Sequence, residues 1–158
     1  METNVLEHTP EVALSDDDPY YRKNPSLDDQ VHCLITVVAA DKVALMKDET
    51  VKTLKDIRLA ARDLGIPQIC ILTRIDVACP LVAEDLKAVY TSKYIKEQMM
   101  GLNAKIGIPM NCIVPVKNYH EEIDLNNDVD MLLLRALTHI VNFADDHVRN
   151  LHCKNENI

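Results

Sequence analysis

Glycine is scarce in this chain of 158 residues, which contains three where average usage of about 7% would give roughly eleven. The glycine-rich phosphate-binding motifs, GxxxxGK[ST] and GxGxxG, need two or three glycines within about eight residues. Gly65, Gly101 and Gly107 are spaced more widely than that, so neither motif occurs. The sequence therefore lacks the usual loop for binding nucleotide phosphates.

Excess positive charge, paired cysteines and long apolar runs are also lacking. A net charge of -8 argues against a protein that neutralises the phosphates of nucleic acid or of a membrane surface. The five cysteines lie far apart with no CxxC pair, which favours reduced thiols. No signal peptide starts the chain, and no apolar run approaches the about 20 residues of a membrane span. We expect a cytoplasmic protein that binds no nucleic acid and does not insert into a membrane.

The chain divides by composition into three parts. Residues 1–30 are polar and contain three prolines and an acidic run, which predicts an irregular arm. Residues 31–151 hold the periodic apolar segments of one globular domain, and residues 152–158 are expected to form a flexible tail.

Strand and helix patterns alternate within the globular part. Val31–Ala40 is a continuous apolar run rich in β-branched residues, as in a strand covered on both faces. Apolar spacing predicts helices over 48–64, 80–90, 94–106 and 128–151. The sequences Gly65-Ile-Pro and Gly107-Ile-Pro each end a helix and precede a buried strand. This alternation predicts an α/β fold with an open, mainly parallel sheet and helices on both faces.

Ligands of open α/β sheets bind beyond the carboxyl ends of the strands, where the second strand is followed by Thr73-Arg74-Ile75-Asp76. This sequence is a variant of the [NT]KxD motif that recognises guanine. A carboxylate accepts two hydrogen bonds from the guanine edge, whereas adenine offers an acceptor at N1 that would stay unpaired. The stem of Arg74 could lie on the face of the base. The alternative is that Asp76 is simply the N-cap of the next helix.

The third strand is followed by a second candidate segment, Pro115-Val116-Lys117. GTP-binding domains carry a short loop here, whose backbone N–H faces the guanine O6. Because a backbone donor depends little on the side chain, Val116 could supply it. The alternative is an ordinary loop at the end of a strand.

Long segments of the chain resemble the interferon-induced protein 44 family, its 44-like members included: VHCLITVVAAD, RLAARDLGIPQICILTRID and GIPMNCIVPVKNYHEEIDLNNDVDMLLLRAL. The resemblance is to the C-terminal half of the family's guanine-nucleotide-binding domain and runs from about residue 16 to residue 148. It implies a P-loop GTPase-like fold, a cytoplasmic protein and a link to interferon-driven immune or antiviral response. It also implies that the guanine-binding residues are Thr73, Arg74, Asp76, Val116 and Lys117.

The departures from the family limit the expected chemistry. The family's phosphate-binding loop, magnesium ligands and switch segments have no counterpart here, so we expect a domain truncated at its N-terminal half. Two hydrogen bonds to a charged Asp contribute about 1.5–3 kcal/mol each, and association costs about 4 kcal/mol or more. GTP or GDP would then bind with about millimolar affinity or weaker. We expect no GTPase activity of the chain's own and no metal site.

A rival interpretation treats the nucleotide site as vestigial and the chain as a protein-interaction module. The apolar strand Val31–Ala40 would leave an open sheet edge, which invites self-association or a protein partner. Two further patterns have plain structural interpretations. The acidic run before residue 129 resembles a calcium loop but lacks its glycine and its Glu, and so predicts a helix cap. Cys33, Cys70 and Cys112 are expected to be buried thiols in apolar strands.

Overall fold

The computed structural model describes residue 17 and residues 24–155. The chain forms two compact units, Met1–Gln30 and Val31–Ile158. In the described part of the first unit, a short 3-10 helix, η1 (Leu27–Asp29), follows Ser26, whose hydroxyl donates to Asp29. Most of the predicted irregular arm lies outside the described residues.

The second unit is built on a parallel sheet in the order β1-β2-β3. The strands are β1 (Leu34–Ala39), β2 (Gln68–Thr73) and β3 (Ile113–Pro115). β1 is shorter than the predicted Val31–Ala40. Its ladder begins where the N–H of Leu34 donates to the carbonyl of Pro67, and Pro67 has no N–H with which to extend it.

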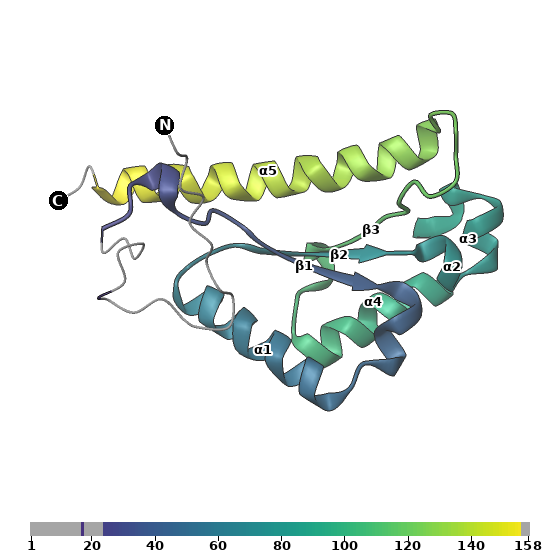
Figure 1. Cartoon of the computed structure of the whole chain (residues 1–158), viewed down its shortest axis with the longest axis horizontal. Coiled ribbons are helices and arrows are strands. Elements are labelled where there is room, and N and C mark those ends of the chain that lie inside the picture. Colours follow the sequence, from purple (N-terminus) through teal and green to yellow (C-terminus); the bar gives the residue numbers. More distant parts are fainter. Residues whose placement is uncertain (1–16, 18–23, 156–158) are drawn as a thin grey trace, which may run out of the picture. The chain divides into compact units, whose positions relative to one another are not determined.

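Helices cover both faces of the sheet, with α1 and α4 on one face and α5 on the other (Figure 1). This confirms the predicted α/β architecture. The predicted helix over 80–90 is two pieces, because the backbone is extended at Asp85, whose carboxylate caps the second piece. α5 also continues into the predicted flexible tail. The bounds are η2 (Ala40–Leu45), α1 (Asp48–Asp63), α2 (Ile75–Ala78), α3 (Pro80–Glu84), η3 (Leu86–Tyr90), α4 (Lys93–Ile106), η4 (Met110–Cys112) and α5 (Asn127–Asn155).

Two glycines end helices as their sequence contexts predict. Gly65 has φ 73°, its N–H donates to Arg62 O, and the N–H of Ile66 donates to Ala61 O. These two bonds form a Schellman motif, which satisfies the last carbonyls of α1. Gly107 has φ 79° and ends α4. Each glycine turns the chain back toward the sheet.

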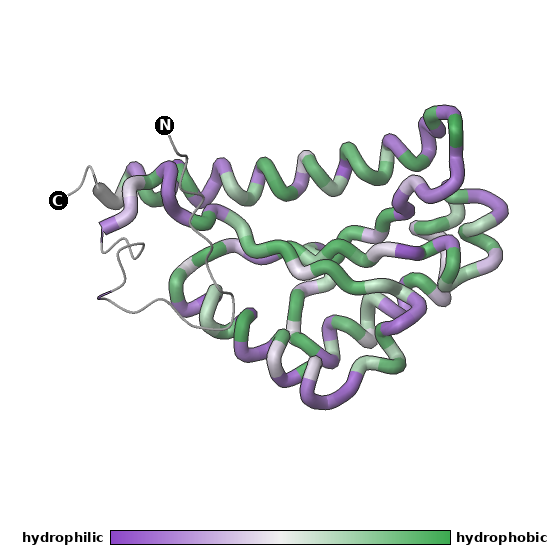
Figure 2. Tube along the Cα trace, in the orientation of Figure 1, coloured by the Kyte–Doolittle hydropathy of each residue, from purple (hydrophilic) through white to green (hydrophobic). Residues whose placement is uncertain are grey.

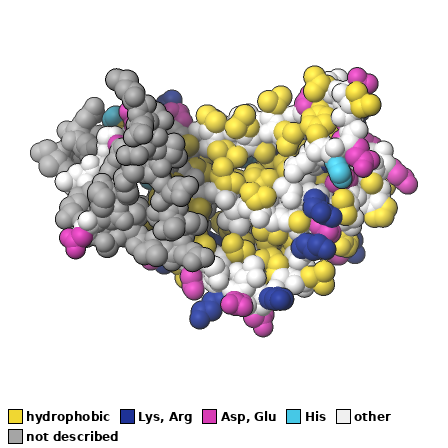
Figure 3. Space-filling model, in the orientation of Figure 1, with side chains coloured by type: hydrophobic (Ala, Val, Ile, Leu, Met, Phe, Trp, Pro, Cys, Tyr) yellow, Lys and Arg dark blue, Asp and Glu magenta, His cyan; other side chains and the backbone are white. Residues whose placement is uncertain are grey.

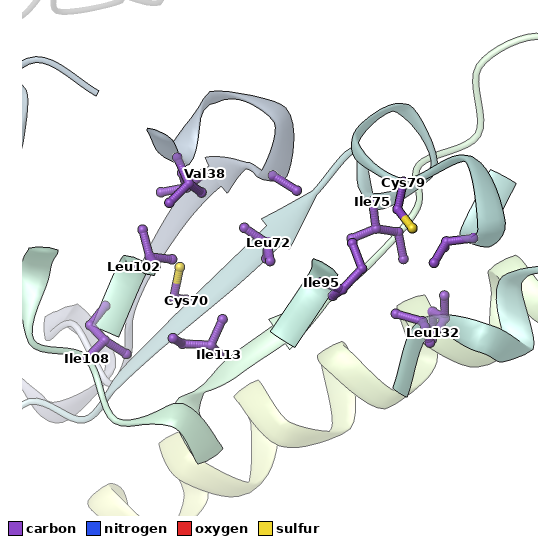
Figure 4. Packing of buried hydrophobic residues seen from close by; sticks show 14 of the residues in the cluster. Val38, Cys70, Leu72, Ile75, Cys79, Ile95, Leu102, Ile108, Ile113 and Leu132 are labelled. Carbon is purple, nitrogen blue, oxygen red and sulfur yellow. The ribbon is translucent and has the colours of Figure 1, made fainter. Parts of the chain in front are cut away.

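Buried apolar side chains form one cluster on each face of the sheet. The cluster on the α4 face includes Cys70 and Leu72 of β2 together with Ile95 and Leu102 of α4 (Figure 4). The smaller cluster on the α5 face includes Ile69, Val114 and Ala136. Figure 2 shows the strands as mainly hydrophobic, whereas α5 alternates along its length, as expected for a helix with one buried side.

The face of β1 that points toward the α5 side is only partly covered. Ile35 and Val37 pair with Ile69 and Ile71 and so share their face, yet they are 41% and 65% exposed. Figure 3 shows hydrophobic side chains gathered between α5 and β1. We call Ile35 and Val37 of β1 the β1 edge surface; α5 carries the further exposed apolar residues Leu134, Leu137 and Val141. Across the described chain, no helix has the length and apolar character that spanning a membrane requires.

Candidate functional site

A pocket of about 310 Å³ opens at the carboxyl ends of β2 and β3. Its volume is at the lower end of the range of small-molecule sites, about 300–1,000 Å³. Its position at the carboxyl ends of the strands is the one where ligands of parallel α/β sheets bind. The lining residues are Arg74, Asp76, Val77, Asn118, Tyr119 and His120.

Asp76 is not the cap of a helix. α2 begins at Ile75 and has Arg74 at its N-cap position, so Asp76 lies within the first turn. Its half-buried carboxylate lines the pocket and makes no hydrogen bond or ion pair with any residue that the structure describes. The helix-cap alternative is thus wrong, and both carboxylate oxygens can accept hydrogen bonds from a ligand.

Arg74 and Thr73 connect the ends of β1 and β2. Arg74 has φ 58° and ψ 36°, and its Nε lies 3.2 Å from Oδ1 of Asp41, which follows β1. The hydroxyl of Thr73 donates to Val38 O at 3.4 Å. Thr73 therefore stabilises the strand ends, whereas Arg74 lines the pocket.

The loop after β3 differs from the prediction. Val116 is fully buried, and its N–H donates to Leu72 O at 2.8 Å, which extends the sheet. That N–H cannot also face a base, so the assignment of Val116 is wrong. The side chain of Lys117 pairs with Glu122 and lies outside the pocket lining. Asn118, Tyr119 and His120 supply this wall instead.

Glu122 and Tyr119 fix the shape of that loop. Glu122 accepts the N–H groups of His120 at 2.8 Å and Glu121 at 3.2 Å, and pairs with Lys117. The Tyr119 hydroxyl donates to Asp130 at 2.7 Å and accepts from the N–H of Asn126. The backbone bond with Asn126 lowers the Tyr119 pKa, but burial and the Asp130 carboxylate outweigh it and raise that pKa. These bonds anchor the pocket wall to the start of α5.

The Glu122 bonds predict that acid loosens the pocket wall. The N–H of His120, the ammonium group of Lys117 and the N–H of Glu122 itself lower the Glu122 pKa from 4.5 to about 2. Because the folded pKa is lowered, the stabilisation is present above pH 4.5 and is lost as the pH falls toward 2. The protection of the His120 and Glu121 amides against hydrogen exchange, relative to their intrinsic exchange rates at each pH, should fall across this window as the pH is lowered. In Glu122→Gln these two amides should be less protected already at pH 5, and wild-type protection that shows no step in this window would contradict the role.

The remaining polar patterns have structural roles. Cys70 is buried in β2, and burial raises its pKa to about 12, as expected for an inert thiol. Cys33 and Cys112 are half-buried and lie outside the strands, contrary to prediction. Asn126 caps α5 by accepting the N–H groups of Asp128 and Val129. No cluster of three or more His, Cys, Asp or Glu side chains suited to a metal occurs among the described residues.

The comparisons with known proteins confirm the resemblance drawn from the sequence. Interferon-induced protein 44 of Mus musculus is 27% identical over 91% of this chain, and the alignment covers 36% of the mouse protein. Interferon-induced protein 44-like of Homo sapiens is 25% identical over 81% of the chain and 28% of that protein. Interferon-induced protein 44 of Homo sapiens is 27% identical over 83% of the chain and 30% of that protein. The chain thus spans about a third of the length of these curated relatives. No protein-family model matches it, and neither does any solved structure.

Proposed function

We propose that this relative of the interferon-induced protein 44 family binds the guanine base in the pocket at the carboxyl ends of β2 and β3. The observation that carries the proposal is the Asp76 carboxylate, which faces the pocket without a partner among the described residues. Its two oxygens match the two adjacent N–H donors of guanine. Adenine would place an acceptor against the carboxylate and lose this pairing, so the site favours guanine.

The proposal gives the chain weak binding and no hydrolysis of its own. The charged hydrogen bonds to Asp76 offset little more than the cost of association, which corresponds to about millimolar affinity. The 158 residues contain no GxxxxGK[ST] motif, and phosphoryl transfer relies on such a loop together with magnesium and a positioned nucleophile. We therefore assign base recognition to these residues and assign them no phosphate chemistry.

Replacing Asp76 with alanine should abolish the preference for guanine. In NMR titrations we expect GDP to bind the wild-type chain about tenfold or more tightly than ADP, because ADP cannot pair with the carboxylate. Asp76→Ala should bind the two nucleotides equally weakly. Asp56→Ala, which removes an exposed carboxylate from α1, should retain the preference. Equal binding of GDP and ADP by the wild-type chain would refute the proposal.

A second candidate function is protein association through the β1 edge surface. β1 has a hydrogen-bonded neighbour on one side only within the described sheet, and its six residues include neither a charge nor a proline. Charged residues and prolines are the usual means by which proteins protect an exposed strand edge. Leu134, Leu137 and Val141 are spaced three and four residues apart along α5, so they share one face of that helix and add further exposed apolar area. These features favour a protein partner, a second copy of the chain included.

The relatives' names support a proposal about the cellular setting of this binding. They describe proteins induced by interferon, and we extend this property to the chain together with a role in immune or antiviral response. A cytoplasmic location is part of the same proposal. The free thiols of Cys33, Cys70, Cys79 and Cys112 support it, because such cysteines suit a reducing compartment.

A further inference from the structure

Arg74 has an unfavourable backbone conformation at the edge of the base pocket. Glycines aside, it is the one residue of the described chain with a positive φ. A side chain with a Cβ disfavours this left-handed region, and such residues gather at functional sites. Neighbouring structure must therefore hold Arg74 in place.

Asp41 is the group that faces Arg74. It is the second residue after β1, at the same edge of the sheet, and its side chain is only 16% exposed. Its Oδ1 lies 3.2 Å from Nε of Arg74, although the direction of the N–H does not make this contact a hydrogen bond. Lys42 approaches the other carboxylate oxygen at 3.6 Å. Charge attraction in a partly buried position therefore holds the arginine.

We propose, on the basis of the base site assigned above, that Asp41 is a positioning residue for the bound base. It holds Arg74 through Nε, so that the guanidinium plane lies against the face of the base while Asp76 pairs with its edge. The terminal nitrogens of Arg74 have no partner among the described residues, which leaves the cation open to the ligand. A planar guanidinium stacks well on an aromatic face.

The same arrangement identifies the class of ligand. Arg74 is the one Lys or Arg among the six residues that line the pocket, and the charge of Asp41 offsets its own. The pocket thus attracts a planar base more than it attracts phosphate. A guanine nucleoside should bind as well as the nucleotide.

Two nucleosides separate the contact with the face from the contact with the edge. Inosine keeps the ring system of guanosine but lacks the 2-amino group that pairs with Asp76. Asp41→Asn should weaken guanosine and inosine equally, by about two- to fivefold, because it disturbs only the stacking cation. Asp76→Ala should bind guanosine and inosine with equal affinity, and more weakly than wild type binds inosine, because inosine keeps the N1–H that pairs with the carboxylate. A structural defect in Asp41→Asn would also weaken both nucleosides equally, so a second measurement must show that Asp41 acts through Arg74.

A double-mutant cycle with Arg74→Gly tests whether Asp41 acts through Arg74. Glycine accepts φ 58° without strain, so this variant should fold at least as well as wild type. Asp41→Asn should have no further effect on nucleoside affinity in the Arg74→Gly background, and Asp56→Asn should have none in either background. NMR titration measures the affinities, and the Nε–H signal of Arg74 should move in Asp41→Asn even without ligand.

The outcomes distinguish this inference from the proposed function. Guanosine binding that is lost in Asp76→Ala but unchanged in Asp41→Asn would overturn the role of Asp41 alone. Effects of Asp41→Asn and Arg74→Gly that multiply, or an unmoved Nε–H signal, would do the same. No guanosine binding by wild type would overturn the base site, and the positioning role with it.

Discussion

Replacing Leu72 with alanine is expected to lower the free energy of unfolding by about 2–5 kcal/mol. Leu72 is 0% exposed and lies in β2, which has β1 on one side and β3 on the other. Its side chain belongs to the cluster between the sheet and α4 (Figure 4), where alanine would leave a cavity. Because domains are stable by only about 5–15 kcal/mol, this loss is a large part of the total. Urea unfolding followed by circular dichroism measures it.

Leu45 provides the matched control for Leu72. It is 71% exposed at the end of η2, so Leu45→Ala should change the free energy of unfolding by no more than about 0.5 kcal/mol. Leu72 also precedes Thr73 and Arg74, and its carbonyl accepts the N–H of Val116. Leu72→Ala should therefore weaken base binding as well. A loss below about 1 kcal/mol would contradict the packing described for β2.

Much of the fold could be predicted from the sequence because local signals and packing agree. Gly65 ends α1 in a left-handed conformation, since glycine alone adopts it without strain, and Pro67 follows where the chain must be extended. The apolar run before Thr73 is buried on both faces, as its composition requires. In such segments the residue's intrinsic preference and its tertiary environment favour the same structure.

The candidate site could be predicted only in part, because strand pairing decides which groups reach the pocket. Asp76 follows β2 as the last residue of a short sequence motif, and that motif predicts its position at the carboxyl end of the strand. The pairing of Val116 with Leu72 depends on the register of two strands far apart in the sequence, and it shifts the pocket wall to Asn118 and beyond. The contact between Asp41 and Arg74 likewise joins the ends of separate strands. No local pattern carries information of that kind.

Replacing Val37 with lysine should abolish self-association of the chain through the unpaired edge of β1. Val37 is 65% exposed, so lysine should cost the folded monomer little. In an assembled edge, the same charge would be buried against apolar side chains without a partner, which is strongly unfavourable. Light-scattering chromatography at increasing concentration should show wild type shifting to larger species and Val37→Lys remaining monomeric.

Leu45→Lys separates the effect of the edge from that of added charge. It raises the net charge by the same amount at an exposed site outside the β1 edge surface, so it should associate like wild type. Leu137→Lys, on the exposed apolar face of α5, should behave like Val37→Lys if one partner covers both the strand edge and the helix. Association that survives Leu137→Lys but not Val37→Lys would restrict the contact to β1. A wild-type chain that remains monomeric at high concentration would remove self-association from this surface and leave only a different protein as its partner.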